Sequence, residues 1–93
     1  MLNYEIVYIV SPEISDGDLN TVIDKVGNFA KKVGGDITEV TQWGRKKFTY
    51  PIRKFLEGNY VHARLEIEPK AVKELSANLE FDNEILRHLI VKL

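Results

Sequence analysis

The stretch Gly58–Ile67, GNYVHARLEI, separates its side chains onto two clearly different faces. Successive residues of a β-strand point to opposite sides of a sheet, so residues two apart share a side. One set is apolar and the other is polar and aromatic: Val61, Ala63, Leu65 and Ile67 against Tyr60, His62, Arg64 and Glu66. Such a strand is typical of a sheet with one side packed on a core. We therefore predict a strand here, following a turn at Glu57-Gly58-Asn59.

A long strand-like segment precedes this turn and runs from Asp36 to Ile52. Polar and apolar residues alternate up to Gln42, where Trp43 breaks the alternation just before Gly44. An extra residue beside a glycine indicates a β-bulge, which resets the two faces of a strand. Beyond the bulge, we expect the even-numbered residues to face the core: Phe48, Tyr50 and Ile52.

The rest of the chain completes a β, α, β, β, α, β order. Residues 2–10 and 85–93 have the alternation of strands. One helix is predicted from Ser15, which resembles a capping box with Asp18, to Gly34-Gly35, and another from Pro69 to Asp82-Asn83. This order predicts a single α+β domain over residues 1–93 with a ferredoxin-like fold. Its four-stranded antiparallel sheet has the strand order 4-1-3-2, with two helices on one face.

The side of the predicted sheet that faces away from the helices is called the open face below. By alternation, it is expected to carry Glu5, Val7, Ile9, Tyr60, His62, Arg64, Leu86, His88 and Ile90. The opposite side of the last strand then carries Ile85, Leu89 and Val91. The open face is too apolar and aromatic for a purely solvated surface, and such a patch usually marks a binding site.

Charge is distributed unevenly along the chain, although the net charge is only −1. Residues 43–64, called the basic island, contain six basic and one acidic side chain and thus carry +5, whereas both flanking segments are acidic. The island lies largely on a predicted edge strand, where lysines also protect against pairing with other sheets. It is equally suited to contact with a polyanion such as nucleic acid. A nearly neutral protein would bind RNA weakly alone.

No catalytic, metal or cofactor site assembles from the residue pattern. Ser11 and Ser15 lie at turn and cap positions, and the strands carrying His62 and His88 are separated by another strand. The chain has no cysteine, no apolar stretch long enough to span a membrane and no signal-peptide pattern at its start. We therefore expect a cytoplasmic, non-enzymatic protein with no cofactor, metal, membrane or small-molecule substrate.

Three segments resemble the bacterial small-subunit ribosomal protein S-six family, in the same order and spacing. They are YEIVYIV, then WGRKKFTYPIRK followed by GNYV, and finally FDNEILRHLIVKL. The middle segment is the most diagnostic, with Phe48-Thr49 in place of the family's usual Leu-Ala. The resemblance covers the whole chain and implies a ferredoxin-like structural component of the small ribosomal subunit. It also implies binding to the central domain of small-subunit ribosomal RNA together with small-subunit ribosomal protein eighteen.

The same resemblance suggests which residues make these contacts. Candidates for RNA contact are the basic residues Arg45, Lys46, Lys47, Arg53, Lys54, Arg87 and Lys92. Candidates for the protein partner lie on the predicted open face: Tyr60, His62, Arg64, Leu86 and His88. Arginine holds phosphate through two parallel hydrogen bonds, whereas lysine acts as a point charge. Contacts that family members make through a charged tail beyond the last strand are not expected for residues 1–93.

Two other functions stay open from the sequence. A stand-alone single-stranded RNA-binding domain of RNA-recognition-motif topology would stack a base on Tyr60, but its characteristic glycine and aromatic pattern is absent from this strand. A small regulatory module of the same topology would bind a small molecule. The first of these is the main alternative to a role in ribosome assembly.

Overall fold

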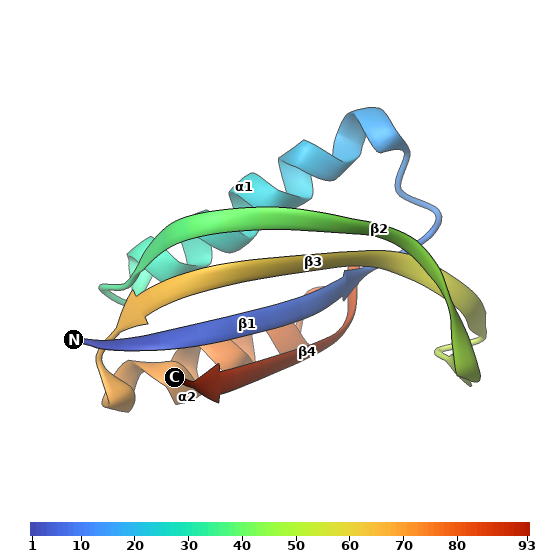
Figure 1. The fold of residues 1–93 in the computed structure, drawn as a ribbon. Helices are drawn as coiled ribbons and strands as arrows, with labels where there is room; N and C mark the ends of the chain where they lie inside the picture. Colours follow the sequence, from blue (N-terminus) through green and yellow to red (C-terminus); the bar gives the residue numbers. More distant parts are fainter.

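A four-stranded antiparallel sheet is covered on one side by two helices in the computed structural model, which describes residues 1–93 (Figure 1). The elements are β1 (Leu2–Val10), α1 (Asp16–Lys32), β2 (Asp36–Ile52), β3 (Phe55–Ile67), α2 (Pro69–Glu80) and β4 (Ile85–Lys92). The spatial order of the strands is β2-β3-β1-β4. The predicted ferredoxin-like fold and strand order are therefore confirmed.

The core lies between the sheet and the helices. Fifteen buried side chains form one cluster, which includes Val61, Ala63, Leu65 and Ile67 of β3. The helices contribute Leu19, Val22, Val26 and Ala30 from α1 and Leu75 and Leu79 from α2. Burying one such aliphatic side chain contributes roughly 1.5–3 kcal/mol. The alternation within GNYVHARLEI thus gives the correct core face for β3.

The predicted signal for the end of α1 is confirmed, but the one for its start is not. At the carboxyl end, Gly34 takes a φ of +84°, and the N–H of Gly35 donates to the carbonyl of Ala30 at 2.8 Å, as the glycine pair predicts. At the amino end, the Ser15 hydroxyl donates to the Asp18 carboxylate at 3.0 Å, and its oxygen accepts no backbone N–H of the first turn. The predicted capping box therefore does not form in its usual arrangement.

The β2–β3 hairpin confirms one prediction and corrects another. Trp43 is the unpaired residue between the pairs Gln42–Val61 and Gly44–Tyr60, and Gly44 has a φ of +89°, so the bulge lies where it is predicted. The turn, however, is made by Arg53 and Lys54, which both have positive φ, and β3 already begins at Phe55. Because β1 pairs with β3 only from Asn59 onward, the hairpin tip projects beyond the rest of the sheet (Figure 1).

The prediction for β4 is correct for Ile85, which lies in the core cluster, but from Arg87 onward the two faces are the reverse of the prediction. Val10 pairs with Ile85 but Ile9 pairs with Arg87, so Leu86 is an extra residue at a bulge. After it, His88, Ile90 and Lys92 lie opposite Tyr8, Ile6 and Tyr4, which belong to the core cluster. The placement of His88 and Ile90 on the open face is therefore wrong, and Arg87, Leu89 and Val91 lie there instead.

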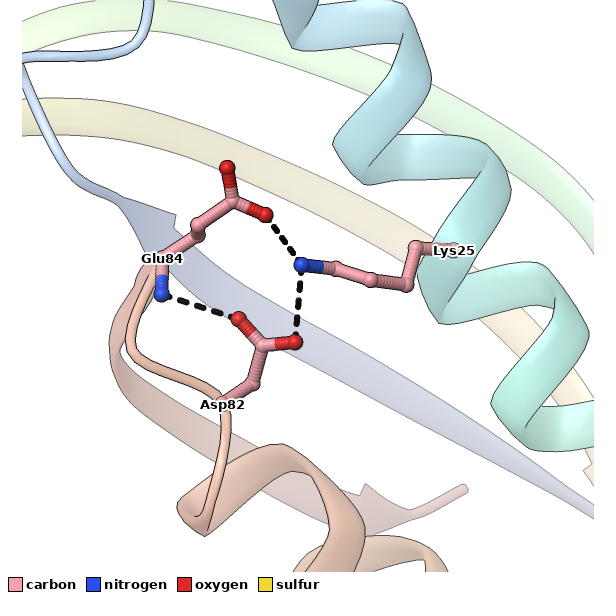
Figure 2. Close-up of polar contacts among 3 residues, drawn as sticks. All are labelled: Lys25, Asp82 and Glu84. Carbon is pink, nitrogen blue, oxygen red and sulfur yellow. Dashed lines mark hydrogen bonds and ion pairs between the residues drawn. The ribbon is translucent and has the colours of Figure 1, made fainter.

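A network of polar side chains joins α1 to the loop before β4 (Figure 2). The Lys25 ammonium group lies 2.8 Å from an Asp82 carboxylate oxygen and also donates to Glu84. The second Asp82 oxygen accepts the backbone N–H of Glu84 at 2.8 Å. Partial burial disfavours the charged lysine, but the hydrogen bonds and charges of the two carboxylates outweigh it and raise the pKa of Lys25. The network links the middle of α1 to the residues just before β4.

Candidate nucleic-acid interface

Rings and a cation line up across β2 and β3 on the open face. The Trp43 ring stacks on the His62 ring, with centroids 5.1 Å apart and an interplanar angle of 6°. The Lys46 ammonium nitrogen lies 5.5 Å from the Trp43 ring centre and 5.7 Å from that of Tyr60, within the range of cation–π attraction. Phe48 packs at a tilt against Tyr60, with centroids 6.2 Å apart. We call these five residues the aromatic ladder.

The bulge in β2 makes this ladder possible. Trp43 has no partner residue in β3, and the positive φ of Gly44 lets the strand bend so that the indole stacks on His62. Trp43 nevertheless stays 46% exposed, so the outer edge of the ladder is available to a partner. Phe48 was expected in the core, but it packs on the open face beside Tyr60 and Gly58. An apolar residue on a strand exposed on both sides does not identify the core side.

An ion pair and a histidine–carboxylate contact occupy the adjoining part of the open face. The His62 ring nitrogen lies 3.6 Å from a Glu5 carboxylate oxygen, and the Arg64 guanidinium lies 3.8 Å from Glu39. Arg64 and Glu39 are largely exposed, and pairs of this kind contribute about 0–1 kcal/mol. These residues therefore supply charge and hydrogen-bonding groups to the surface more than they stabilise the fold.

The predicted RNA-contact residues do not form one uniform row. Arg45 donates to the carbonyl of Pro12 at 3.1 Å, in the loop between β1 and α1, and Lys46 is held over the ladder rings. Lys92 lies opposite Tyr4, on the helix side of β4. The others make no ion pair within 4.0 Å, and we call them the unpaired cations: Lys47, Arg53, Lys54 and Arg87.

The predicted partner-contact residues are also divided. Tyr60, His62 and Arg64 lie on the open face as expected, because their neighbours in β3 all belong to the core. Leu86 is buried at the β4 bulge outside the core cluster. His88 instead lies on the helix side, 2.6 Å from the Ser76 hydroxyl of α2. Burial lowers the pKa of His88, although the charge of Glu80 acts in the opposite direction.

Sequence reasoning missed the apolar stretch that replaces His88 on this surface. Leu89 and Val91 lie opposite Val7 and Glu5 of β1 on the open face, where Leu89 is 62% exposed. Both sides of β4 contain apolar residues, so the sequence does not indicate which side faces the core and which lies on the open face. The open face thus combines the aromatic ladder at one side with an aliphatic strip at the other.

A surface hollow of about 330 Å³ lies under the hairpin. Residues 47–52 of β2, Tyr60 of β3 and Arg87 of β4 line it, and we call it the hairpin hollow. Tyr50 was expected in the core, but it is 78% exposed because the hairpin continues past the end of β1 and the helices. The hollow therefore brings an exposed aromatic ring near two of the unpaired cations.

The chemistry of this surface is that of a binding site. No three histidine, aspartate or glutamate side chains gather as metal ligands, and none of the helices has the length and apolar character to cross a bilayer. The one contact between a serine and a histidine, Ser76 with His88, lies on the helix side of the sheet. The fold and its open face thus define a ferredoxin-like domain whose exposed sheet surface carries stacked rings, aliphatic side chains and cations.

Comparisons with known proteins identify the particular family. A family model described as Ribosomal protein S6 matches residues 3–92. Small ribosomal subunit protein bS6 of Desulforamulus reducens is 32% identical over 92 residues, covering 99% of this chain and 97% of that protein. The Clostridioides difficile protein of the same name is 37% identical and is covered to 98%, as is this chain. The crystal structure of 30S ribosomal protein S6 from Thermotoga maritima aligns with a TM-score of 0.89 at 26% identity, covering 99% of this chain and 87% of that one.

The chain therefore belongs to the ribosomal protein S6 family. This confirms the family inferred from the three sequence segments. Family members are structural proteins of the small ribosomal subunit and not enzymes, so the predicted non-enzymatic role and the cytoplasmic location in that subunit are confirmed as well.

Proposed function

We propose that the protein binds the central domain of small-subunit ribosomal RNA as a pair with small-subunit ribosomal protein eighteen. The observation that carries the proposal is the chemical division of the exposed sheet. Rings and aliphatic side chains on the open face suit a protein partner, and the unpaired cations around the hairpin suit phosphate groups. Membership of a small-subunit ribosomal protein family supports this site of action.

The structure changes the set of residues that we assign to each contact. Tyr60, His62 and Arg64 are retained for the protein partner, with Leu89 and Val91 in place of His88. For RNA, the unpaired cations Lys47, Arg53, Lys54 and Arg87 are the best supported, together with Lys46. Arg45 and Lys92 are less well supported, since one is engaged with the Pro12 carbonyl and the other lies on the helix side.

The charge of the chain explains why two proteins would be needed. Four unpaired cations can neutralise only a few phosphates, and the acidic remainder of the chain brings the net charge to −1. Each phosphate contact adds roughly 0.7–0.9 to the slope of log affinity against log salt, so few contacts mean weak binding at physiological salt. A basic companion protein supplies the missing positive charge and covers the apolar open face.

A filter-binding titration with and without the companion tests this proposal. We expect weak binding of the central-domain RNA by this chain alone and much tighter binding by the pair, both at physiological salt. Tight binding of unstructured RNA by the chain alone would contradict the proposal and favour the stand-alone RNA-binding alternative. Failure of the pair to bind the central-domain RNA would reject the proposed function itself.

A further inference from the structure

The hairpin hollow has an exposed wall and a packed floor. Its wall is Tyr50, whose ring is 78% exposed although it belongs to a strand. Its floor includes Tyr60, which the tilted contact with Phe48 holds in place. A ring this exposed contributes little burial energy to the fold, and its faces are accessible to a partner. The ring of Tyr50 is therefore positioned to stack on a group that comes from outside the chain.

The charged residues that line the hollow are both positive. Lys47 and Arg87 line it, no carboxylate does, and neither cation has an acidic partner within 4.0 Å. Arg87 also borders a second hollow of about 250 Å³, which it shares with Arg53 and Glu80. The Glu80 carboxylate would repel an anion there. An anion is therefore favoured on the Tyr50 side of Arg87, where the guanidinium offers parallel hydrogen bonds.

The size of the hollow limits what can enter it. At about 330 Å³ it is near the lower end of the roughly 300–1,000 Å³ range of small-ligand pockets. This volume accommodates one flat ring and an attached sugar, but not a stack of several bases. A flat ring joined to a phosphate matches the arrangement of Tyr50 beside Arg87 and Lys47. Aromatic side chains next to cations are the usual means of holding an unstacked base.

We propose that the hairpin hollow holds one unstacked nucleotide of RNA, with its base on the Tyr50 ring and its phosphate on Arg87. The inference rests on the proposed RNA-binding function and assigns it a specific contact. Tyr50 lies on the hairpin beyond the end of β1, whereas Arg87 and Tyr60 both lie opposite Ile9 near that end. The hollow therefore occupies only the hairpin end of the open face, and the remainder of that face, including Leu89 and Val91, is left for a protein partner.

The test uses the full chain with its companion protein and central-domain RNA. Tyr50→Ala should weaken RNA binding by the pair about 5- to 100-fold, whereas Tyr50→Phe should stay close to the parent protein because the ring is kept. Arg87→Gln should reduce the salt slope by about one, and Tyr50→Ala should leave that slope unchanged. Ultraviolet crosslinking of the parent complex should attach a single nucleotide to the peptide that contains Tyr50.

Phe81→Ala provides a matched control, because Phe81 is also an exposed aromatic residue, 86% exposed, but lies at the end of α2 outside the hollow. It should leave RNA affinity unchanged. If the pair binds RNA but Tyr50→Ala behaves like Phe81→Ala, the nucleotide site is wrong and the proposed function stands. If Tyr50→Ala weakens binding to the companion protein in the absence of RNA, the hollow is a protein contact and the inference is overturned. If the pair does not bind the RNA, both proposals fail.

Discussion

Lys25 is the residue through which α1 holds the loop before β4 (Figure 2). Lys25→Met keeps the aliphatic stem but leaves Asp82 and Glu84 without their shared cation. We expect the free energy of unfolding to fall by about 1–2 kcal/mol, a modest loss because Lys25 is partly exposed and water screens the ion pairs. Urea denaturation at pH 7 measures it. Lys32→Met, at the exposed end of the same helix and without an ion pair, should cost less than about 0.5 kcal/mol. Equal losses in the two variants would show that the network adds no stability.

His88 makes stability depend on pH because its imidazole is partly buried on the helix side of the sheet. Burial lowers the pKa of His88 in the folded protein, so the unfolded chain binds its proton more readily. Stability should therefore be fully present above the ordinary histidine pKa of about 6.5 and be lost as pH falls below it. Urea denaturation between pH 7 and pH 5 should show this fall, and His88→Gln should reduce it. His62→Gln is the matched control, since it removes the other histidine and leaves the Ser76 contact intact. A fall that persists in His88→Gln would assign the effect to other groups.

At the scale of the elements, the β2–β3 hairpin carries a local conflict between sequence and conformation. Arg53 and Lys54 adopt φ values of 48° and 73°, a region in which ordinary residues are strained by roughly 1–2 kcal/mol each. Tight hairpin turns of this kind usually contain asparagine and glycine. The two cations at the hairpin tip therefore make the turn less stable than asparagine and glycine would. Local strain of this kind is typical of a functional segment.

Replacing the second turn residue separates these two effects. Lys54→Gly should raise the free energy of unfolding by about 0.5–1 kcal/mol because glycine relieves the positive φ. Lys54→Ala removes the same charge but keeps the strain, so it should give no such gain. Both variants should weaken RNA binding by the pair to a similar extent if Lys54 contacts phosphate. Thermal unfolding and filter binding measure the two quantities. Equal stability of the glycine and alanine variants would show that this turn is not strained.

The elements also show where prediction from the sequence succeeds and where it cannot. The core face of β3 and the bulge at Trp43 are predictable, because strict alternation and a glycine give direct signals. The turn at Arg53-Lys54 contains no glycine or asparagine, whereas the nearby Glu57-Gly58-Asn59 has the composition of a turn. The prediction therefore places the turn several residues too late. The bulge at Leu86 lies in a strand that is apolar on both sides, and hence nothing in the sequence sets its register.

Some residues of the candidate site are predicted on the correct side of the sheet and others are not. Tyr60 and His62 were placed correctly because the register of β3 follows from its core face. His88 was misplaced with β4, and Tyr50 was assigned to the core because the length of the hairpin beyond β1 is a tertiary property. The stack of Trp43 on His62 depends on pairing between strands and could not be read from either residue alone.

At the scale of the whole molecule, one side of the sheet stabilises the fold and the other is left for partners. The helix side contains the fifteen-residue core cluster, whereas the open face holds the aromatic ladder and the aliphatic strip. A sheet that is covered on one side only retains an exposed apolar surface, which usually marks an interaction site. Stability and binding should consequently respond to different substitutions.

Lys46→Glu combined with Lys47→Glu should weaken assembly onto ribosomal RNA and reduce its salt dependence, because two cations of the proposed RNA contact become anions. The free energy of unfolding should change by less than about 1 kcal/mol, since both residues are exposed and only Lys46 lies over aromatic rings, those of Trp43 and Tyr60. Leu75→Ala should have the opposite pattern, with lower stability and unchanged RNA affinity. It removes a fully buried side chain and should cost about 2–5 kcal/mol, yet RNA affinity should be retained wherever the protein stays folded. Urea denaturation and co-sedimentation with small subunits from cell extract measure the two effects. Loss of assembly in Leu75→Ala under folded conditions would mean that the two sides of the sheet are not independent. An unchanged salt slope in the lysine variant would mean that these lysines only protect the edge of β2.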